Sequence, residues 1–203
     1  MEPIPQHTGR ALPLRRSDVD TDQIIPSDWL KRVERTGFGA GLFSEWRADP
    51  AFVLNDDRFA GASVLLAGPG FGTGSSREHA VWALEDFGFR VVVSPRLADI
   101  FRTNCTKVGL VPVEIGAEDV ERLMDAVEAE PATEVEVDVA GRRLRCRPAG
   151  VDVAFPLDDF TTWRLVEGLD DVGLTLRHLA QIDAFESRRP PWLPVAGEAD
   201  THA

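Results

Sequence analysis

Apolar and polar positions alternate in blocks through the middle of the chain. Short apolar runs at residues 63–67, 90–94 and 111–115 have the length of buried strands. The segments that follow them carry apolar side chains at helical spacing, at residues 77–87, 96–107 and 117–129. Gly88 directly follows the first of these segments and Gly109 stands two residues after the second, where helices commonly end. The alternation predicts an α/β fold with parallel strands.

A period-two pattern replaces this alternation further along the chain. Residues 134–139 alternate strictly between acidic side chains and valine, and Ala140 and Gly141 mark a turn into residues 142–147. An antiparallel hairpin should therefore extend the parallel strands into a mixed sheet. We also expect a short strand at residues 11–14 and further helical segments at residues 29–34, 43–52, 57–59, 158–167 and 171–185. We expect one domain over residues 1–188 and a disordered, proline-bearing tail over residues 189–203.

Composition and charge exclude several classes of protein. The chain has 203 residues and a formal net charge of −12, and no basic stripe is interleaved with aromatic residues, which argues against nucleic-acid binding. No apolar run has the length of a membrane span, and the first residues lack the basic and apolar regions of a signal peptide. We therefore expect a cytoplasmic protein without a membrane partner. Cys105 and Cys146 are too few to hold an iron–sulfur cluster or a structural zinc ion.

The segment GPGFGTGSSREH at residues 68–79 has the strongest chemical character. Its glycines let the backbone turn sharply and approach a ligand closely. The predicted helix that follows starts here, and the free N–H groups of a helix N-terminus attract anions. Ser75 and Ser76 place hydroxyl groups at this point, and Arg77 adds a guanidinium suited to a carboxylate. The segment predicts a site for a carboxylate or a phosphate.

The same residues allow a purely structural interpretation. Ser75 followed by Glu78 also fits a capping box, in which the serine caps the helix and the glutamate reaches back to it. The segment matches neither a P-loop, nor a dinucleotide-binding glycine motif, nor a nucleophile elbow. Pattern alone leaves the anion site and the helix cap as equal alternatives.

Three long motifs connect the chain to a known family. The sequences DVDTDQIIP at residues 18–26, GTGSSREHAVWAL at residues 72–84 and IFRTNCTKVGLVP at residues 100–112 resemble signatures of the small subunits of 3-isopropylmalate dehydratase, relatives of aconitase. The motifs occur in family order, and similarity extends to FESRRP at residues 185–190. Small departures occur at Thr73, Val81 and Val108, and none of them touches the Ser-Ser-Arg sequence.

The resemblance implies both a fold and a reaction. The fold would be the swivelling β/β/α domain of the aconitase superfamily. The reaction would be the interconversion of 2-isopropylmalate and 3-isopropylmalate through 2-isopropylmaleate, a hydro-lyase step of leucine biosynthesis. The family uses a [4Fe–4S] cluster held by a separate large subunit, so this chain would bind a dicarboxylate substrate and a large-subunit partner but no metal.

The resemblance also implies roles for individual residues. Ser75 would remove the substrate proton, Ser76 would donate within the same cluster, and Arg77 would bind a substrate carboxylate. Asp22 matches an acidic active-site position, although it could instead be an aspartate that caps a turn. Asp20 is expected to be a turn or cap residue. Two neighbours of the serines are expected to be structural, namely Glu78 as a capping partner and His79 as a packing residue.

Substrate preference is assigned by the resemblance to the segment that contains Leu30, Lys31 and Arg32. Leu30 could contact the isopropyl group, and Lys31 or Arg32 the distal carboxylate. The alternative is an amphipathic helix with exposed basic residues. Two other functions also stay open. One is the small subunit of a related hydro-lyase acting on homoaconitate, methylmalate or dimethylmalate, and the other is a non-catalytic anion-binding module.

Overall fold

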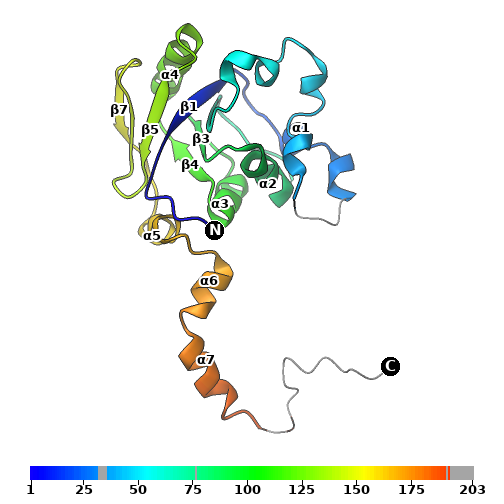
Figure 1. Cartoon of the computed structure of the whole chain (residues 1–203), viewed down its shortest axis with the longest axis vertical. Helices are drawn as coiled ribbons and strands as arrows, with labels where there is room; N and C mark the ends of the chain where they lie inside the picture. Colours follow the sequence, from blue (N-terminus) through cyan, green and yellow to red (C-terminus); the bar gives the residue numbers. More distant parts are fainter. Residues whose placement is uncertain (32–35, 76, 191, 193–203) are drawn as a thin grey trace. The chain divides into compact units, whose positions relative to one another are not determined.

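A seven-stranded mixed sheet forms the centre of the protein. The computed structural model describes residues 1–31, 36–75, 77–190 and 192. Residues 1–170 form one compact unit, and residues from Asp171 onward form a second. In the first unit the strands lie in the order β4-β3-β2-β1-β5-β6-β7 (Figure 1). The sheet is parallel on one side of β1 and antiparallel on the other.

The parallel half is buried on both faces. Its strands read as continuous valine and leucine runs because helices or turns cover each face of a parallel sheet. Every residue of β2 and β3 is buried. The strands that follow β1 in this half are β2 (Val64–Ala67), β3 (Val91–Ser94) and β4 (Val111–Glu114).

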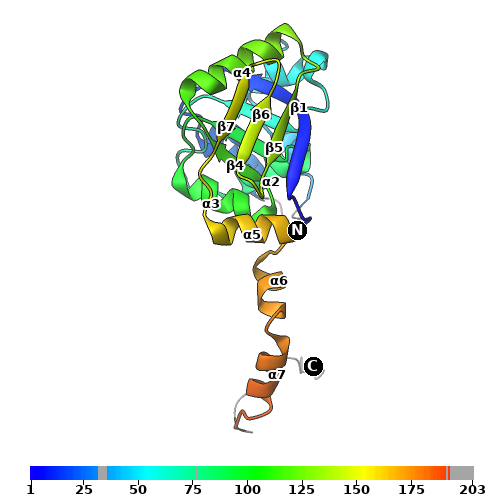
Figure 2. The ribbon, with the colours of Figure 1, turned by 90° about the vertical axis from the view of Figure 1, so that its left-hand side faces the viewer.

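Strand β1 (Gln6–Leu14) belongs to both halves of the sheet. Its last residues, 11–14, pair in parallel with β2, and residues 6–10 pair in an antiparallel ladder with β5. The antiparallel half consists of β5 (Glu134–Asp138), β6 (Arg143–Cys146) and β7 (Val151–Ala154). In β5 the buried residues alternate with exposed acidic ones, as expected for a sheet with one face in water (Figure 2).

The helices of the first unit cover the parallel half. Helices α2 (Glu78–Phe87) and α3 (Asp99–Val108) pack against each other, and α4 (Ala117–Ala129) packs against β1, β2 and β3 on the other face (Figure 1). Arg15, directly after β1, binds three carboxylates of α4, those of Glu121, Asp125 and Glu128. Helix α5 (Asp159–Glu167) ends this unit and is capped by the Asp158 carboxylate, which accepts from the Thr161 N–H at 2.9 Å.

The connection from β1 to β2 carries the first sequence motif. It begins with the one-turn helix α1 (Thr21–Ile24) and, in its described residues, continues through five short 3₁₀ helices. These are η1 (Ser27–Lys31), η2 (Phe38–Gly41), η3 (Trp46–Ala48), η4 (Val53–Asn55) and η5 (Asp57–Phe59). Helix η2 packs against α2, where the Gly39 N–H donates to the Asp86 carboxylate at 2.7 Å.

The described residues of the second unit form two short helices, α6 (Asp171–Leu176) and α7 (Leu179–Glu186). Neither helix contains a buried residue. None of the helices in the described part of the chain has the length and apolar character needed to cross a membrane. The expected single domain over residues 1–188 stays a prediction, and most of the expected tail lies outside the described residues.

The predicted α/β class and the antiparallel hairpin are confirmed. Three details of the prediction are wrong. The first strand begins at Gln6 because residues 6–10, although polar, supply the backbone partners of β5. Residues 171–185 form two helices rather than one, and β7 adds a strand that the pattern did not predict. The helix expected at residues 29–34 is the 3₁₀ helix η1 as far as Lys31, and its remainder lies outside the described residues.

Candidate active site

The carboxyl edge of the parallel half brings the first two motifs together. Strands β1 and β2 run parallel, so the segments that follow them emerge at the same edge of the sheet. Backbone hydrogen bonds join these segments. The Asp18 N–H donates to the Pro69 carbonyl at 2.8 Å, and the Gly72 N–H donates to the Val19 carbonyl at 2.8 Å. Two segments that are distant in the sequence are thereby placed side by side.

The glycine loop has a backbone shape that other residues rarely adopt. Gly70, Gly72 and Gly74 all have positive φ angles, of 77°, 81° and 94°. A Cβ atom at Gly72 would lie 2.2 Å from the ring of Phe101, which belongs to α3. Glycine is therefore required at position 72 for two reasons, the positive φ angle and the close approach of Phe101, which belongs to the third motif.

Helix α1 begins with a complete capping box. The Asp20 carboxylate accepts from the Gln23 N–H at 2.8 Å, and the Gln23 amide oxygen accepts from the Asp20 N–H at 3.0 Å. The cap role expected for Asp20 is thus confirmed. The neighbouring Asp22 takes no part in the cap, and its exposed carboxylate binds another partner.

Helix α2 begins without such a cap. It starts at Glu78, and its N-cap residue is Arg77, which makes no side-chain cap hydrogen bond. Ser75 lies two residues before this N-cap and is exposed. The capping box considered for Ser75 and Glu78 is therefore wrong, because the helix starts too late for Ser75 to cap it. Ser76 lies outside the described residues.

An ion pair joins the two helix starts. The Arg77 Nη1 group donates to the Asp22 carboxylate. The Arg77 side chain is 22% exposed and that of Asp22 is 55% exposed, so the pair lies at the surface with the guanidinium the more enclosed partner. The structure thus brings Ser75, Arg77 and Asp22 into one neighbourhood at the carboxyl edge of the sheet.

The residues that follow in α2 have packing roles. The ring of His79 makes edge contacts with Phe38 at 5.4 Å and with Trp82 at 4.7 Å between ring centroids. Glu78 forms an ion pair with Lys107 of α3 at 3.7 Å. These contacts attach the first turn of α2 to η2 and to α3, and they hold the base of the glycine loop in place.

The segment expected to set substrate preference is described only in part. Leu30 is partly exposed in η1, and Lys31 is exposed and pairs with Asp28 of the same turn at 3.0 Å. The Trp29 ring lies against Gly41, where an added Cβ would be 2.4 Å from a ring carbon. Arg32 lies outside the described residues. Lys31 is therefore exposed and ion-paired, as the alternative of a helix with exposed basic residues predicts, whereas Leu30 keeps an accessible apolar surface.

The two cysteines do not suit a metal cluster. Cys105 in α3 and Cys146 in β6 are both buried, and burial raises the pKa of each thiol above its ordinary value. Metals bind the thiolate, and three or four closely spaced ligands are needed for an iron–sulfur cluster. Among the described residues there is no group of three or more His, Cys, Asp or Glu side chains that could hold a metal ion. These residues do not fit a cluster.

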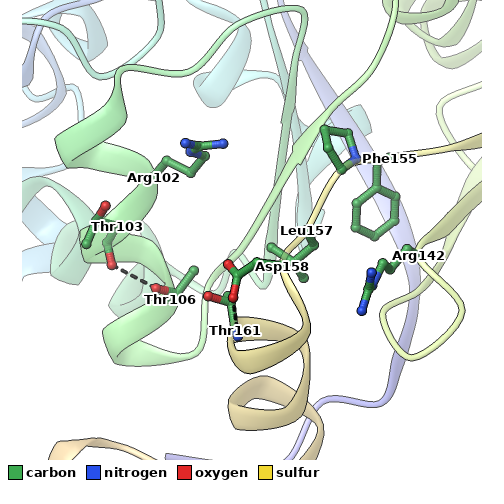
Figure 3. A pocket seen from close by; sticks show the side chains of 9 residues that line it. Arg102, Thr103, Thr106, Arg142, Phe155, Leu157, Asp158 and Thr161 are labelled. Carbon is green, nitrogen blue, oxygen red and sulfur yellow. Dashed lines mark hydrogen bonds between the residues drawn. The ribbon is translucent and has the colours of Figure 1, made fainter.

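A hollow of about 530 Å³ lies elsewhere, between α3, the start of α5 and the turn before β6. Arg102, Thr103 and Thr106 lie on one side of it and Phe155 and Arg142 on the other (Figure 3). Its guanidinium groups are already paired, that of Arg102 with Glu114 at 3.4 Å and that of Arg142 with Asp159. None of the candidate site residues in the described part of the chain lines this hollow.

Comparison with known proteins gives consistent results along the chain. A family model described as the aconitase C-terminal domain matches residues 1–118, and one described as the C-terminal domain of the 3-isopropylmalate dehydratase small subunit matches residues 171–196. The 3-isopropylmalate dehydratase small subunit of a Parafrankia species is 70% identical over 96% of this chain and 99% of its own length. That of Frankia alni is 67% identical over 97% of this chain and 100% of its own length.

A solved structure supports the same assignment. The crystal structure of a 3-isopropylmalate dehydratase from Methanocaldococcus jannaschii matches with a TM-score of 0.65 and 26% identity, over 88% of this chain and 99% of that one. The fold expected from the motifs is thus confirmed. The chain belongs to the family of 3-isopropylmalate dehydratase small subunits, in the aconitase superfamily.

Proposed function

We propose that this chain is the proton-transferring half of a 3-isopropylmalate dehydratase. Together with a large subunit it interconverts 2-isopropylmalate and 3-isopropylmalate through 2-isopropylmaleate. The observation that carries the proposal is the exposed Ser75, which lies before an uncapped helix start and beside the Arg77–Asp22 pair. A serine used only for capping would bond to the first turn of α2, and the late start of the helix rules that out.

Ser75 is proposed to remove the proton next to the substrate carboxylate. A serine hydroxyl is a weak acid, so its anion must be stabilised by its surroundings. The N-terminus of α2 supplies a positive dipole end, and Arg77 supplies a positive charge two residues away. Both favour a negative oxygen at this position, and Ser76 is proposed to donate a hydrogen bond in the same cluster.

Arg77 is proposed to bind a substrate carboxylate while Asp22 orients it. A guanidinium has five N–H donors arranged in a plane, and Asp22 accepts from the Nη1 group. The donors that remain can form a two-point contact with a second carboxylate, which is the geometry that arginine provides and lysine does not. Asp22 thus serves as a positioning residue for Arg77 in addition to its place in the family motif.

The departure of the substrate hydroxyl is proposed to depend on the partner. A [4Fe–4S] cluster on the large subunit would supply a Lewis-acidic iron that stabilises the leaving oxygen. Cys105 and Cys146 are buried and far apart in the sequence, so this chain offers no ligand set for such a cluster. Its own contribution is to bind the substrate carboxylate and to move the proton.

Substrate preference is proposed to depend on Leu30, with Lys31 and Arg32 as candidate contacts to the distal carboxylate. A hydrophobic pocket separates substrates that differ by one methylene by only about 1–3 kcal/mol, so a related alkylmalate could be accepted through few changes. The partly exposed Leu30 favours a branched apolar substituent. We further propose that the enzyme works in the cytoplasm, where the substrates of such a biosynthetic step would be found.

Reconstitution tests the proposal. The purified chain should be colourless, contain no iron and fail to hydrate 2-isopropylmaleate, and a large subunit with its cluster should be inactive alone. Mixing the two should give turnover that is followed by the ultraviolet absorbance of the unsaturated intermediate. Stoichiometric iron and activity in this chain alone would contradict the proposal that the cluster belongs to the large subunit. A mixture that forms a complex but turns over none of the alkylmalates would favour the non-catalytic module.

A further inference from the structure

Thr21 contacts the glycine loop through both its backbone and its side chain. Its N–H donates to the Thr73 carbonyl at 2.9 Å, and its Oγ1 hydroxyl donates to the Ser75 carbonyl at 3.0 Å. The residue is only 2% exposed. The two accepting carbonyls belong to the residues on either side of Gly74. Thr21 therefore binds the loop both before and after Gly74, the residue that precedes the proposed base Ser75.

Gly74 is the residue of the loop that lies against Asp20 and Thr21. Its φ angle of 94° is one that glycine adopts readily, but glycine also has the greatest backbone freedom to lose. An added Cβ at Gly74 would lie 3.5 Å from Thr21 Oγ1 and 3.4 Å from the Asp20 Cβ atom. The loop therefore rests against the capped start of α1 at this position.

The hydroxyl of Thr21 fixes the peptide group of Ser75 itself. The Ser75 carbonyl accepts a second hydrogen bond, from the Arg77 N–H at 2.7 Å. Two donors from different segments thus hold the orientation of this carbonyl, whose carbon is bonded to the Cα atom that carries the Ser75 side chain. The next residue after Thr21 is Asp22, which binds the Arg77 side chain.

We propose that Thr21 is a positioning residue for the dehydratase reaction, acting through the backbone of Ser75. This inference rests on the proposed function, because it gives Thr21 a role only if Ser75 acts on the substrate. Two adjacent residues of α1 would then position different parts of the site. Thr21 would orient the glycine loop, and Asp22 would orient the guanidinium of Arg77. Displacement of a reacting group by about 1 Å can lower a rate by roughly 100-fold, so a single buried hydroxyl is sufficient for a measurable effect.

Three variants test the proposal in the complex with the large subunit. Thr21→Val keeps the shape but removes the donor, Thr21→Ser keeps the donor, and Thr162→Val is a matched control. Thr162 is 8% exposed, and its hydroxyl also donates to a backbone carbonyl, that of Asp158, at 2.9 Å. We expect Thr21→Val to lower kcat by about 10- to 100-fold with little change in KM. Thr21→Ser should recover most of that loss, and Thr162→Val should leave kcat unchanged.

A second measurement does not depend on activity. In the isolated chain, amide hydrogen exchange of residues 73–77 should be faster in Thr21→Val than in the native protein, and unchanged in Thr162→Val. A kcat for Thr21→Val within threefold of native, equal impairment of Thr21→Ser, or unchanged loop exchange would each overturn the inference. An inactive native complex would instead overturn the proposed function, so the two failures are distinguishable.

Discussion

Helices α1 and α2 begin on facing sides of the same site, and their first turns differ sharply. Helix α1 has a complete capping box between Asp20 and Gln23. Helix α2 starts at Glu78 with an N-cap residue, Arg77, that makes no side-chain cap bond. Both sequences, Asp-x-x-Gln and Ser-x-x-Glu, look equally suitable for capping. The start of α1 is thus satisfied by its own side chains, whereas the start of α2 has no side-chain cap, as the proposed anion site requires.

The two starts also divide the proposed tasks. In the proposed mechanism the segment from Thr21 through Leu30 supports the loop, orients the guanidinium and contacts the substrate, whereas Ser75 is proposed to carry out the proton transfer. Substitutions on the α2 side should therefore affect turnover or the binding of the substrate carboxylate, and those on the α1 side should affect stability, alignment or preference. Four variants, one of them with a companion variant, test this contrast.

Ser75→Ala should produce the largest effect. Loss of a general base typically lowers a rate by ~10²–10⁴, which corresponds to about 3–5 kcal/mol of barrier. Because Ser75 does not cap α2, the melting temperature and the assembly with the large subunit should stay unchanged. Turnover of the assembled complex and its thermal unfolding are the measurements. A variant that keeps more than about a tenth of the native rate would remove the base role and make Ser76 the next candidate.

Arg77→Lys should weaken substrate binding more than it slows the chemistry. Lysine keeps the positive charge but loses the two-point contact with a carboxylate. A hydrogen bond to a charged group contributes about 1.5–3 kcal/mol, so KM should rise by roughly 10- to 150-fold. Steady-state kinetics separate KM from kcat. An unchanged KM would show that the substrate carboxylate binds elsewhere.

Leu30→Ala should alter preference on the α1 side. Removing apolar contact should reduce the discrimination between isopropyl- and methyl-substituted substrates by about 1–3 kcal/mol, while kcat on the best substrate changes less. The ratio of kcat/KM for the two substrates is the measurement. Lys31→Ala is the companion variant, because the exposed Lys31–Asp28 pair predicts little effect if Lys31 does not touch the substrate. Equal losses on both substrates would remove the specificity role of Leu30.

Asp20→Ala should have the smallest effect and the opposite profile to Ser75→Ala. Loss of an N-cap side chain lowers stability by about 1 kcal/mol. Thermal unfolding of the isolated chain measures this loss, and turnover of the assembled complex should fall far less than with Ser75→Ala. If Asp20→Ala leaves the stability of the chain unchanged, the capping box does not stabilise the start of α1, and the two helix starts do not differ in this respect.

The sequence was sufficient to predict the parallel half of the fold. The runs that became β2, β3 and β4 are continuously apolar because they are buried on both faces, which is a strong local signal. The first half of β1 gave no such signal. Residues 6–10 pair with β5 through backbone hydrogen bonds. Polar side chains allow this pairing, but they give no apolar pattern from which a strand could be predicted. Strand β7 was missed for a similar reason, since only its first residue is buried.

The candidate site was predictable as a set of residues but not as an arrangement. Ser75, Arg77 and Asp22 came from the motifs, and the structure places them together. The late start of α2 depends on the path of the glycine loop, which is fixed by hydrogen bonds to a segment distant in the sequence. Thr21 could not be predicted because its role arises only from the contact with the Ser75 carbonyl. The sequence offered one indication of a role for Thr21, namely its position between two aspartates of the first motif.

The burial of both thiols has a consequence for how the enzyme is put together. Cys105 and Cys146 stay protonated at neutral pH because burial raises their pKa values. A protonated, enclosed thiol neither captures free iron nor exchanges with a disulfide. In the proposed complex these two thiols would therefore be poor iron ligands and poor targets for oxidation, so they would not compete with the large subunit for iron.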